Sequence, residues 1–546
     1  MQQSNPAMEP DAVSYAPVDA IFSGFESNSS PGFALAILRD GKVVYKKGYG
    51  MANLEYGIPI RPNTVFHVAS VSKQFTAFAI QLLASEGKLS VDDDVRKFVP
   101  ELHEFEAVIT INHLLHHTSG LRDQWSLLNL AGWRSEDVIT EEDILGLVWR
   151  QSDLNFAPGA EELYSNTGYT LLGLIVKRIS GCTLREFCEQ RIFGPLGMKD
   201  THFHDDNTEI VKRRAYCYNS DGAAGFRHAP LQYANTGATS LFTTVEDLSK
   251  WERNFAKPRV GDESVLASMV KQGALSSGKQ INYASGLMVS KYRGLATVEH
   301  TGSDAGFRAD FLRFPDQRFA VILLSNLGSV YPALLARKIA DILLEGHFDE
   351  PSQQDESSNS GIPYDSRVCE NVSGDYLIGS FWLFTFSWDA KGLWLKPSDG
   401  ERMQVFPLSE TEFCLKGAEV RFVFTFSEEG VAENMRLIDH GREMSGAKIV
   451  RTPELSPTNI AEYVGSYFSR ELGVLYFVTC SEGKLQVRHP RGTEEMMPVQ
   501  SDVFLTGGPI GRIGFVRDHV SNRIQGFNVT HSRVRNLRFE RTNLEG

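Results

Sequence analysis

Two segments in the last third of the chain share a pattern of glycine, proline and aromatic residues at one fixed spacing. Gly374 and Gly465 are 91 positions apart, and further pairs keep that spacing. These pairs are Tyr376 with Tyr467, Phe386 with Phe477, Gly392 with Gly483, Pro407 with Pro498, Phe413 with Phe504, and Phe424 with Phe515. Chance would supply about one such match, so the pattern indicates a duplicated module. Short apolar stretches between Gly-containing and charged turns predict a small antiparallel barrel or sandwich for each copy.

A polar stretch separates these repeats from the rest of the chain. Residues 350–366 carry Pro, Gly, Ser and acidic side chains without apolar periodicity, which is typical of a linker. The sequence therefore predicts a first domain over 1–349, a linker over 350–366, one repeat over 367–452 and a second over 453–546. Neither repeat carries a chemical constellation of its own.

Strand and helix patterns are mixed in the first domain. Apolar residues over 33–38 and 43–45 flank an Asp-Gly pair, which predicts a hairpin. Residues 71–86 carry apolar side chains at helical spacing and end before a glycine, which predicts a helix. We also expect helices at 141–150, 167–180, 183–191, 245–256 and 331–345, and strands at 311–314 and 319–324. Helices between two groups of strands favour an α+β or α/β domain.

Charge and composition exclude several classes of protein. The formal net charge of −13 argues against nucleic acid as a partner, because phosphate binding needs a basic face. No apolar run reaches about 18 residues, so we expect no membrane-spanning helix. The six cysteines lack C-x-x-C spacing and are expected to be ordinary buried thiols. No leader is visible at the start, so we expect a cytoplasmic protein, or a secreted or periplasmic one if a leader was removed. The oligomeric state stays open.

The segment Ser-Val-Ser-Lys at 70–73 is the sharpest candidate for chemistry. Residues three apart share a helix face, so the Lys73 amine can reach the Ser70 hydroxyl. The positive end of the helix dipole, together with burial, favours a neutral and basic Lys73. The same spacing also occurs at Ser85, Ser268, Ser276, Ser445 and Ser481. Unlike these five serines, Ser70 both follows a strand-like stretch and begins a helix.

Two further elements carry candidate site residues. Tyr164 and Asn166 stand in Tyr-Ser-Asn before a predicted helix, and Tyr233 begins a Tyr-Ala-Asn of the same spacing. A phenol beside a Ser–Lys pair can carry the proton to a leaving group, and spacing alone does not choose between the two tyrosines. The other element is His300-Thr301-Gly302-Ser303, at a predicted strand edge where glycine would let a substrate backbone approach closely.

These three elements, in this order, resemble the Ser-x-x-Lys, Tyr-x-Asn and Lys/His-Thr-Gly boxes of the penicillin-binding and class C β-lactamase family of serine hydrolases. The stretches 114–121, 164–169 and 192–198 are also similar to family members. The resemblance covers roughly 20–349. It implies an α+β catalytic domain with an antiparallel sheet flanked by helices, and it favours Tyr164. The layout is most similar to the bacterial D-aminopeptidase type, which carries two C-terminal β-barrels.

The resemblance also implies roles for the site residues. Ser70 would attack a carbonyl and form an acyl-enzyme, Lys73 would take the proton, and Tyr164 would help to deliver it to the leaving group. The backbone N–H groups of Ser70 and Ser303 would form the oxyanion hole. The residues expected to bind substrate are Asn166, His300, Thr301, Gly302 and Ser303. Arg122, Asp123 and Trp125 are expected to border the pocket. No cofactor is expected.

His300 departs from many family members, which have lysine there. A neutral histidine holds a carboxylate less well than a permanent cation. This disfavours an efficient β-lactamase or D-Ala-D-Ala carboxypeptidase and favours an aminopeptidase, amidase or esterase. The expected substrates are small peptides or amides, including those with an N-terminal D-residue, or short esters. Two alternatives stay open: an esterase or weak β-lactamase of the same fold, and a non-catalytic protein that binds peptidoglycan fragments or a partner.

Two groups of histidines have spacings that metal sites also use. One group is His113, His116 and His117, which lies in a stretch that resembles a non-catalytic segment of the family. The other is His202 and His204 with Asp205, in a segment that reads as a loop. We expect neither group to bind a metal.

Overall fold

The computed structural model describes residues 14–25, 27–349, 363–379, 382–397, 402–415, 420–439, 442–449 and 457–543. The chain forms two compact units, each assembled from separate segments. The first unit comprises Met1–Ser90, Leu172–Gly273 and Gln280–Glu350. The second comprises Val91–Leu171, Ala274–Lys279 and Pro351–Gly546. Most of the predicted linker, 350–362, lies outside the described residues.

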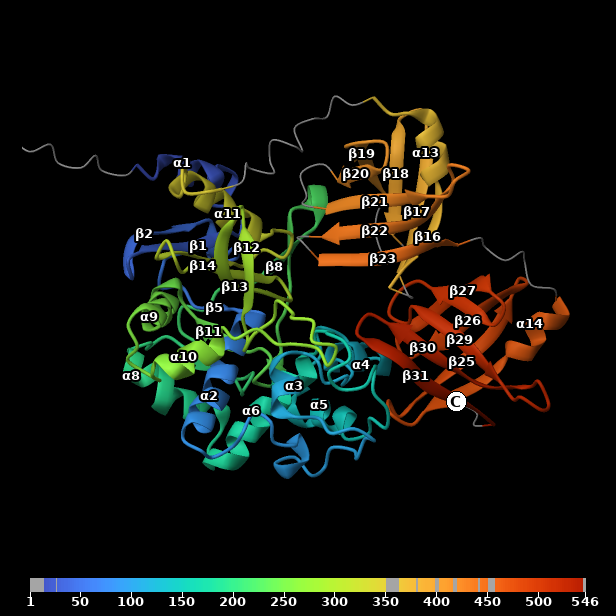
Figure 1. Ribbon diagram of the computed structural model, residues 1–546, viewed down its shortest axis with the longest axis horizontal. Coiled ribbons are helices and arrows are strands. Elements are labelled where there is room, and N and C mark those ends of the chain that lie inside the picture. The colour runs from blue at the N-terminus through green and yellow to red at the C-terminus, as the bar shows by residue number, and fades with distance from the viewer. Residues whose placement is uncertain are drawn as a thin grey trace, which may run out of the picture. The chain divides into compact units, whose positions relative to one another are not determined.

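A six-stranded sheet forms the centre of the first unit, in the order β12-β13-β14-β15-β1-β2 (Figure 1). Every neighbouring pair is antiparallel. The strands are β1 (Phe33–Arg39), β2 (Lys42–Tyr49), β12 (Met288–Tyr292), β13 (Leu295–Asp304), β14 (Phe307–Phe314) and β15 (Phe319–Ser325). Since β1 pairs with β15, the beginning and end of the predicted first domain meet in one sheet. The α+β expectation, with an antiparallel sheet, is confirmed.

The hairpin predicted around the Asp-Gly pair is confirmed as β1–β2. Asp40 and Gly41 both adopt positive φ, at 54° and 69°. Two consecutive left-handed residues match the right-handed twist of the strands they join, and Asp-Gly is favoured there. Strand β1 is buried from Phe33 to Leu38, so it lacks the alternation of a strand with one wet face.

Helices cover the sheet and bury its apolar residues. The buried residues of α11 (Pro332–Leu343) form one core with Phe33, Leu35 and Ile37 of β1 and with residues of α1 (Ala16–Ile21). Helix α9 (Val245–Ala256) also contacts β1 and β15. A small sheet in the order β5-β11-β7 lies in the same unit, from β5 (Phe66–His67), β7 (His202–Phe203) and β11 (Leu241–Thr243).

The predicted helices are present, α9 with the predicted ends and the others with one or both ends shifted. They are α2 (Lys73–Ser85), α5 (Glu141–Val148), α6 (Asn166–Ser180), α7 (Leu184–Cys188), α9 and α11. The other helices of this part of the chain are α3 (Ile111–Leu115), α4 (Gln124–Ala131), α8 (Gly194–Leu196) and α10 (Glu263–Met269). Short strands are β3 (Met51–Asn53), β4 (Ile58–Pro59), β6 (Ile139–Thr140), β8 (Tyr218–Ser220), β9 (Phe226–His228) and β10 (Tyr233–Ala234).

Both repeats are closed eight-stranded antiparallel barrels, β16–β23 and β24–β31 (Figure 1). The first has β16 (Gly374–Ile378), β17 (Trp382–Asp389), β18 (Gly392–Pro397), β19 (Met403–Pro407), β20 (Glu412–Leu415), β21 (Val420–Phe426), β22 (Ala432–Asp439) and β23 (Arg442–Ile449). The second has β24 (Gly465–Ser469), β25 (Val474–Ser481), β26 (Lys484–His489), β27 (Gly492–Gln500), β28 (Val503–Thr506), β29 (Arg512–Arg517), β30 (Ile524–His531) and β31 (Val534–Thr542). A short helix precedes each barrel, α13 (Ser366–Val372) and α14 (Pro457–Tyr463).

The duplication is confirmed, but its spacing is not constant along the barrels. Ile378 pairs with Trp382, whereas Ser469 pairs with Val474, so the second repeat has one more residue in this hairpin. The structural counterpart of Phe386, which faces Gly374, is therefore Val478, which faces Gly465. Both are buried, so the match of Phe386 with Phe477 is a coincidence of composition.

Two expectations about the chain as a whole can be compared with the structure. Among the described residues, no helix is both long enough and apolar enough to cross a membrane. All six cysteines lie in the described ranges and are free thiols. Cys480 is exposed, which differs from the expectation of a buried thiol.

Candidate active site

Ser70 lies in a single 3-10 turn between a short strand and a long helix. The turn spans Ala69–Ser72, after β5 and directly before α2. Ala69 adopts φ of 47°, a left-handed conformation that is costly for a residue with a Cβ. This bend directly precedes Ser70, whose side chain is half-buried.

Lys73 is the first residue of α2 and is fully buried. Its Nζ lies 3.1 Å from the Ser70 Oγ and 2.7 Å from the carbonyl oxygen of Ala238. The predicted contact between the amine and the hydroxyl is therefore present. The Ala238 carbonyl comes from a loop far along the chain, which sequence spacing gives no means to identify.

Glycines let other segments pack against the Ser70 turn. A Cβ on Gly302 would lie 2.2 Å from the Val68 carbonyl oxygen, so only glycine fits where β13 passes that residue. Gly286 has φ of 71°, and a Cβ there would lie 2.6 Å from the Lys73 carbonyl oxygen. The close approach that we expected Gly302 to allow for a substrate is, in this structure, made by the chain itself.

His300 is buried on β13 and hydrogen-bonded on both ring nitrogens. Its Nε2 lies 2.9 Å from the Tyr283 hydroxyl, and its Nδ1 lies 2.6 Å from the Thr301 carbonyl oxygen. Because a carbonyl oxygen accepts, Nδ1 carries a proton. Thr301 and Ser303 are exposed, on the opposite side of the strand from the buried His300 and Gly302.

Asp304 follows the predicted His-Thr-Gly-Ser element and was not identified from the sequence. Burial raises the pKa of this carboxyl to about 6, against the opposing effect of hydrogen bonds from Thr239 and Tyr233 and of the Lys73 charge. The Thr239 hydroxyl donates to Oδ2 at 3.0 Å. The competing tyrosine, Tyr233, is thus a partner of Asp304 in the first unit.

Asn166, in the second unit, is fixed by a carboxylate at the first turn of α6. Its backbone N–H and its side-chain amide both donate to Asp123 Oδ2, at 2.8 and 2.7 Å. The other oxygen, Oδ1, caps α4 by accepting from the N–H groups of Trp125 and Ser126. Asp123 therefore holds two helix starts together, which gives a role to a residue expected only to border the pocket.

Tyr164 is enclosed by His117 and Arg533. The His117 ring centroid is 4.1 Å from that of Tyr164, and the Arg533 guanidinium lies 4.9 Å from the Tyr164 ring centroid. Arg533 lies in the turn between β30 and β31 of the second barrel, and its guanidinium is 3.7 Å from Asp123 Oδ2. Nothing in the sequence predicts this contact, because periodicity does not show which barrel turn reaches the Tyr-x-Asn segment.

A buried ion pair fixes the same barrel to the helical segment of the second unit. Arg122 is fully buried and donates to Glu471 Oε2 at 2.7 Å and to the Asp153 carbonyl oxygen at 2.7 Å. It also donates to the carbonyl oxygen of Arg535. Burial raises the pKa of Glu471, and the Arg122 charge opposes that rise. Arg122 therefore has a structural role rather than an exposed position at a pocket.

The three histidines of the first group hold local structure and do not converge. His113 Nδ1 accepts from the Thr110 N–H, His116 Nδ1 bonds the Asn112 carbonyl oxygen, and His117 Nδ1 accepts from the Ser165 N–H.

The predicted residues are divided between the two units. Ser70, Lys73 and the element 300–303 lie in the first, and Tyr164 and Asn166 lie in the second.

Comparison with known proteins identifies the family of this chain. The model of the family described as Beta-lactamase matches residues 18–344, which is more than half of the chain. The chain belongs to the Beta-lactamase family. The match includes every candidate site residue predicted from the sequence and ends before the barrels. Members of this family are serine hydrolases.

Relatives of this Beta-lactamase family chain include penicillin-binding proteins and D-aminopeptidases. Penicillin-binding protein 4* of Bacillus subtilis is 28% identical over 420 residues, which cover 74% of this chain and 92% of that protein. A D-aminopeptidase of Gluconobacter oxydans is 29% identical over 325 residues, which cover 59% of this chain and 61% of that protein. The octameric penicillin-binding protein homologue from Pyrococcus abyssi shares the fold, with a TM-score of 0.58 at 23% identity over 88% of this chain and 99% of that one.

Proposed function

We propose that this protein is a serine hydrolase that forms an acyl-enzyme at Ser70 and cleaves amide bonds of small peptides. The observation that carries the proposal is the 3.1 Å contact between Lys73 Nζ and Ser70 Oγ, with Lys73 fully buried. Burial disfavours a charged ammonium, so this amine is suited to accept the hydroxyl proton. The Ala238 carbonyl, 2.7 Å from Nζ, holds the amine in place.

In the proposed reaction, a bond forms between Ser70 Oγ and the substrate carbonyl carbon while the hydroxyl proton moves to Lys73. Backbone N–H groups of Ser70 and Ser303 stabilise the negative oxygen of the tetrahedral intermediate. The carbon–nitrogen bond then breaks, and the leaving amine takes a proton that Tyr164 delivers. Water hydrolyses the acyl-enzyme by the reverse transfers and restores the hydroxyl.

The surroundings of Tyr164 support a role in proton transfer. A guanidinium over an aromatic ring favours negative charge on the phenol oxygen, so Arg533 would stabilise a developing phenolate. Asn166 is held by two hydrogen bonds to Asp123, which suits a residue that must keep one orientation toward a substrate.

The surroundings of His300 support a substrate without a carboxylate next to the cleaved bond. Its ring is engaged by Tyr283 and by the Thr301 carbonyl, and it is not a permanent cation like the lysine of many relatives. We therefore propose aminopeptidase-like cleavage, with peptides that begin with a D-residue as the first substrates to test. The likeness to proteins named D-aminopeptidase supports this choice.

The test is a comparison of D- and L-aminoacyl anilides, p-nitrophenyl esters and a cephalosporin as substrates. We expect anilide hydrolysis that falls at least about 10³-fold in Ser70→Ala and in Lys73→Met. Ser85→Ala is the matched control, because Ser85 begins another Ser-x-x-Lys and its hydroxyl bonds the Leu82 carbonyl. Faster ester or cephalosporin turnover would assign the esterase or β-lactamase alternative. Hydrolysis that survives Ser70→Ala would contradict the mechanism.

A further inference from the structure

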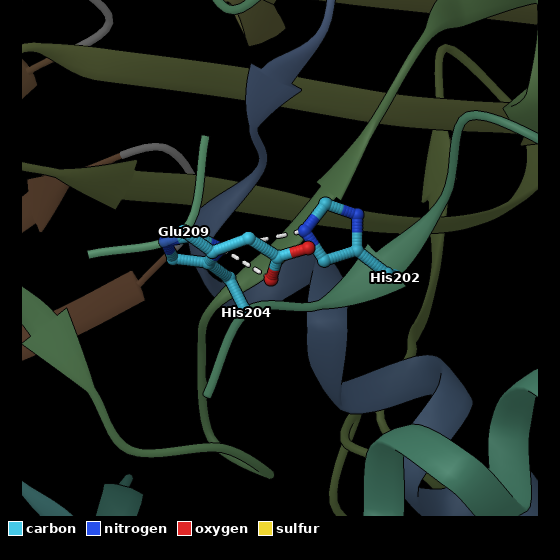
Figure 2. A group of neighbouring side chains, drawn as sticks. All are labelled: His202, His204 and Glu209. Atoms are coloured by element: carbon cyan, nitrogen blue, oxygen red, sulfur yellow. Dashed lines mark hydrogen bonds and ion pairs between the residues drawn. The ribbon is translucent and has the colours of Figure 1, made fainter. Parts of the chain in front are cut away.

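Three side chains of the first unit converge at the end of β7, away from the residues used above. His202 lies on β7, His204 follows it, and Glu209 lies in the next loop. One ligand atom from each lies within 4.8 Å of the others. Among the residues that the structure describes, His202, His204 and Glu209 form the one group of three or more His, Cys, Asp or Glu side chains whose ligand atoms come this close together. In Figure 2 the Glu209 carboxylate points toward the two imidazole rings, and dashed lines mark the contacts of His204 with His202 and with Glu209.

The chain places the two rings together for a simple reason. Residues two apart on an extended segment point to the same side, so His-x-His presents both imidazoles on one face. Phe242, on the neighbouring strand β11, pairs with His202 of β7. Its ring centroid lies 5.8 Å from that of His202 and 4.7 Å from that of His204. Phe242 therefore helps to place both rings.

The spacing of the two ring nitrogens matches that of a tetrahedral metal site. His202 Nε2 and His204 Nδ1 are 3.3 Å apart, and His204 Nδ1 is 3.8 Å from Glu209 Oε2. Zinc bonds of about 2.0–2.1 Å, arranged tetrahedrally, hold neighbouring ligand atoms about 3.3 Å apart. The two nitrogens already have this spacing, whereas the Glu209 oxygen would have to move closer to them when a metal binds. Two histidines and one glutamate are also a known zinc ligand set.

The two nitrogens of the His204 ring have different surroundings. Nε2 is buried and has no hydrogen-bond partner among the described residues, whereas Nδ1 faces His202 and Glu209. Nδ1 is therefore the nitrogen that would bind a metal.

Arg185 orients the carboxylate of Glu209. It donates to both oxygens, at 2.6 and 2.9 Å, and to Asp205 Oδ1 at 2.9 Å. A carboxylate has about four lone-pair positions, so each oxygen can accept from Arg185 and still bind a cation. Ligating carboxylates are commonly held by such outer hydrogen bonds. Asp205, which stands next to His204 in the sequence, pairs with Arg185.

Contrary to the expectation from the sequence that these histidines bind no metal, we propose that His202, His204 and Glu209 form a binding site for one divalent transition metal of the zinc class. The side chain of Glu209 is 36% exposed and His202 is half-buried, so a metal can enter from solvent. The site joins the loop after β7 to a sheet whose other edge strand, β5, leads to the Ser70 turn. Its function is to fix this loop, and it takes no part in the proposed hydrolysis.

The test measures metal uptake by the full chain without an affinity tag. Protein stripped with a chelator is given Zn²⁺ in competition with a chromophoric indicator, and bound zinc is counted by mass spectrometry. We expect one Zn²⁺ per chain, and loss of at least 10-fold in affinity in His202→Asn and in Glu209→Gln. His228→Asn, at an exposed histidine of the same unit, is the matched control and should bind zinc as the wild type does.

Two further readouts separate a metal site from a hydrogen bond between the rings. Co²⁺ should give the visible absorption of a tetrahedral site in the wild type and not in Glu209→Gln. Zn²⁺ should raise the unfolding temperature of the wild type and of Ser70→Ala, but not of Glu209→Gln. Because Ser70→Ala should bind normally, failure of the proposed hydrolysis would leave this result unaffected. A wild type that takes up no zinc, or uptake that persists in both ligand variants, would overturn the proposal.

Discussion

The buried pair Arg122–Glu471 provides a test of how the second unit is held together. Arg122 is fully buried, and the side chain of Glu471 is 7% exposed. Glu471→Gln keeps the shape of the side chain but removes its charge, so the buried Arg122 guanidinium loses its close counterion. The acid that remains near it, Asp153, is 3.7 Å away and 71% exposed. Removing one partner of a buried pair costs about 3–5 kcal/mol. Since about 1.36 kcal/mol changes an equilibrium constant tenfold, this cost corresponds to about 10²–10⁴-fold more frequent opening of the contact.

Hydrogen exchange is the suitable assay, because unfolding of a chain with several domains does not give one free energy. The backbone N–H of Asp123 donates to the Arg533 carbonyl, and that of Arg535 donates to Asn155, so exchange over 120–125 and 531–536 reports this contact. We expect Glu471→Gln to accelerate both segments by that factor. Arg122→Met combined with Glu471→Gln should cost less than the sum of the single changes, with a coupling of about 2–3 kcal/mol.

The control is Glu495→Gln in the same barrel. Glu495 pairs with Lys484 at 2.9 Å, but these side chains are 55% and 62% exposed. An exposed pair is worth less than about 1 kcal/mol, which is under about fivefold in exchange rate. The reasoning would be refuted if Glu471→Gln changed exchange no more than Glu495→Gln does.

Three further predictions follow from the described residues. Burial and the neighbouring Glu299 raise the pKa of Asp310, which favours its protonated form, so Asp310→Asn should change the denaturation midpoint little; a large loss would contradict this. The pKa of Asp304 is raised from 3.8 to about 6, so its contribution to stability is present below pH 3.8 and is lost as the pH rises through 6. Melting temperatures across this range should show that loss in the wild type and not in Asp304→Asn. Finally, Tyr164→Phe should lower kcat/KM at least about 10²-fold and Tyr233→Phe less than tenfold, and the reverse order would assign proton transfer to Tyr233.

Local patterns predicted the elements well because they depend on neighbours in sequence. The Asp-Gly hairpin, the helix after Ser70 and the duplicated barrels all follow from turn residues and apolar periodicity. The inserted residue between Ser469 and Val474 was missed, because a comparison of the two repeats at one fixed spacing cannot reveal a single inserted residue.

The candidate site was predicted in part, and the residues that were missed share one property. Ala238, Asp304, Arg533 and Glu471 reach their partners across long stretches of chain or through the tertiary fold, which periodicity does not encode. The same limit applies to His202 and His204, whose third neighbour is Glu209 and not the adjacent Asp205.

The most direct test of the central claim is covalent labelling of Ser70. Intact-protein mass spectrometry after treatment with a fluorophosphonate, and separately with a penicillin, should show one adduct, with peptide mapping to Ser70. The adduct should be lost in Ser70→Ala and kept in Ser85→Ala. No adduct with either probe, or an adduct that survives Ser70→Ala, would contradict the account and favour a protein that binds its ligand without cleaving it.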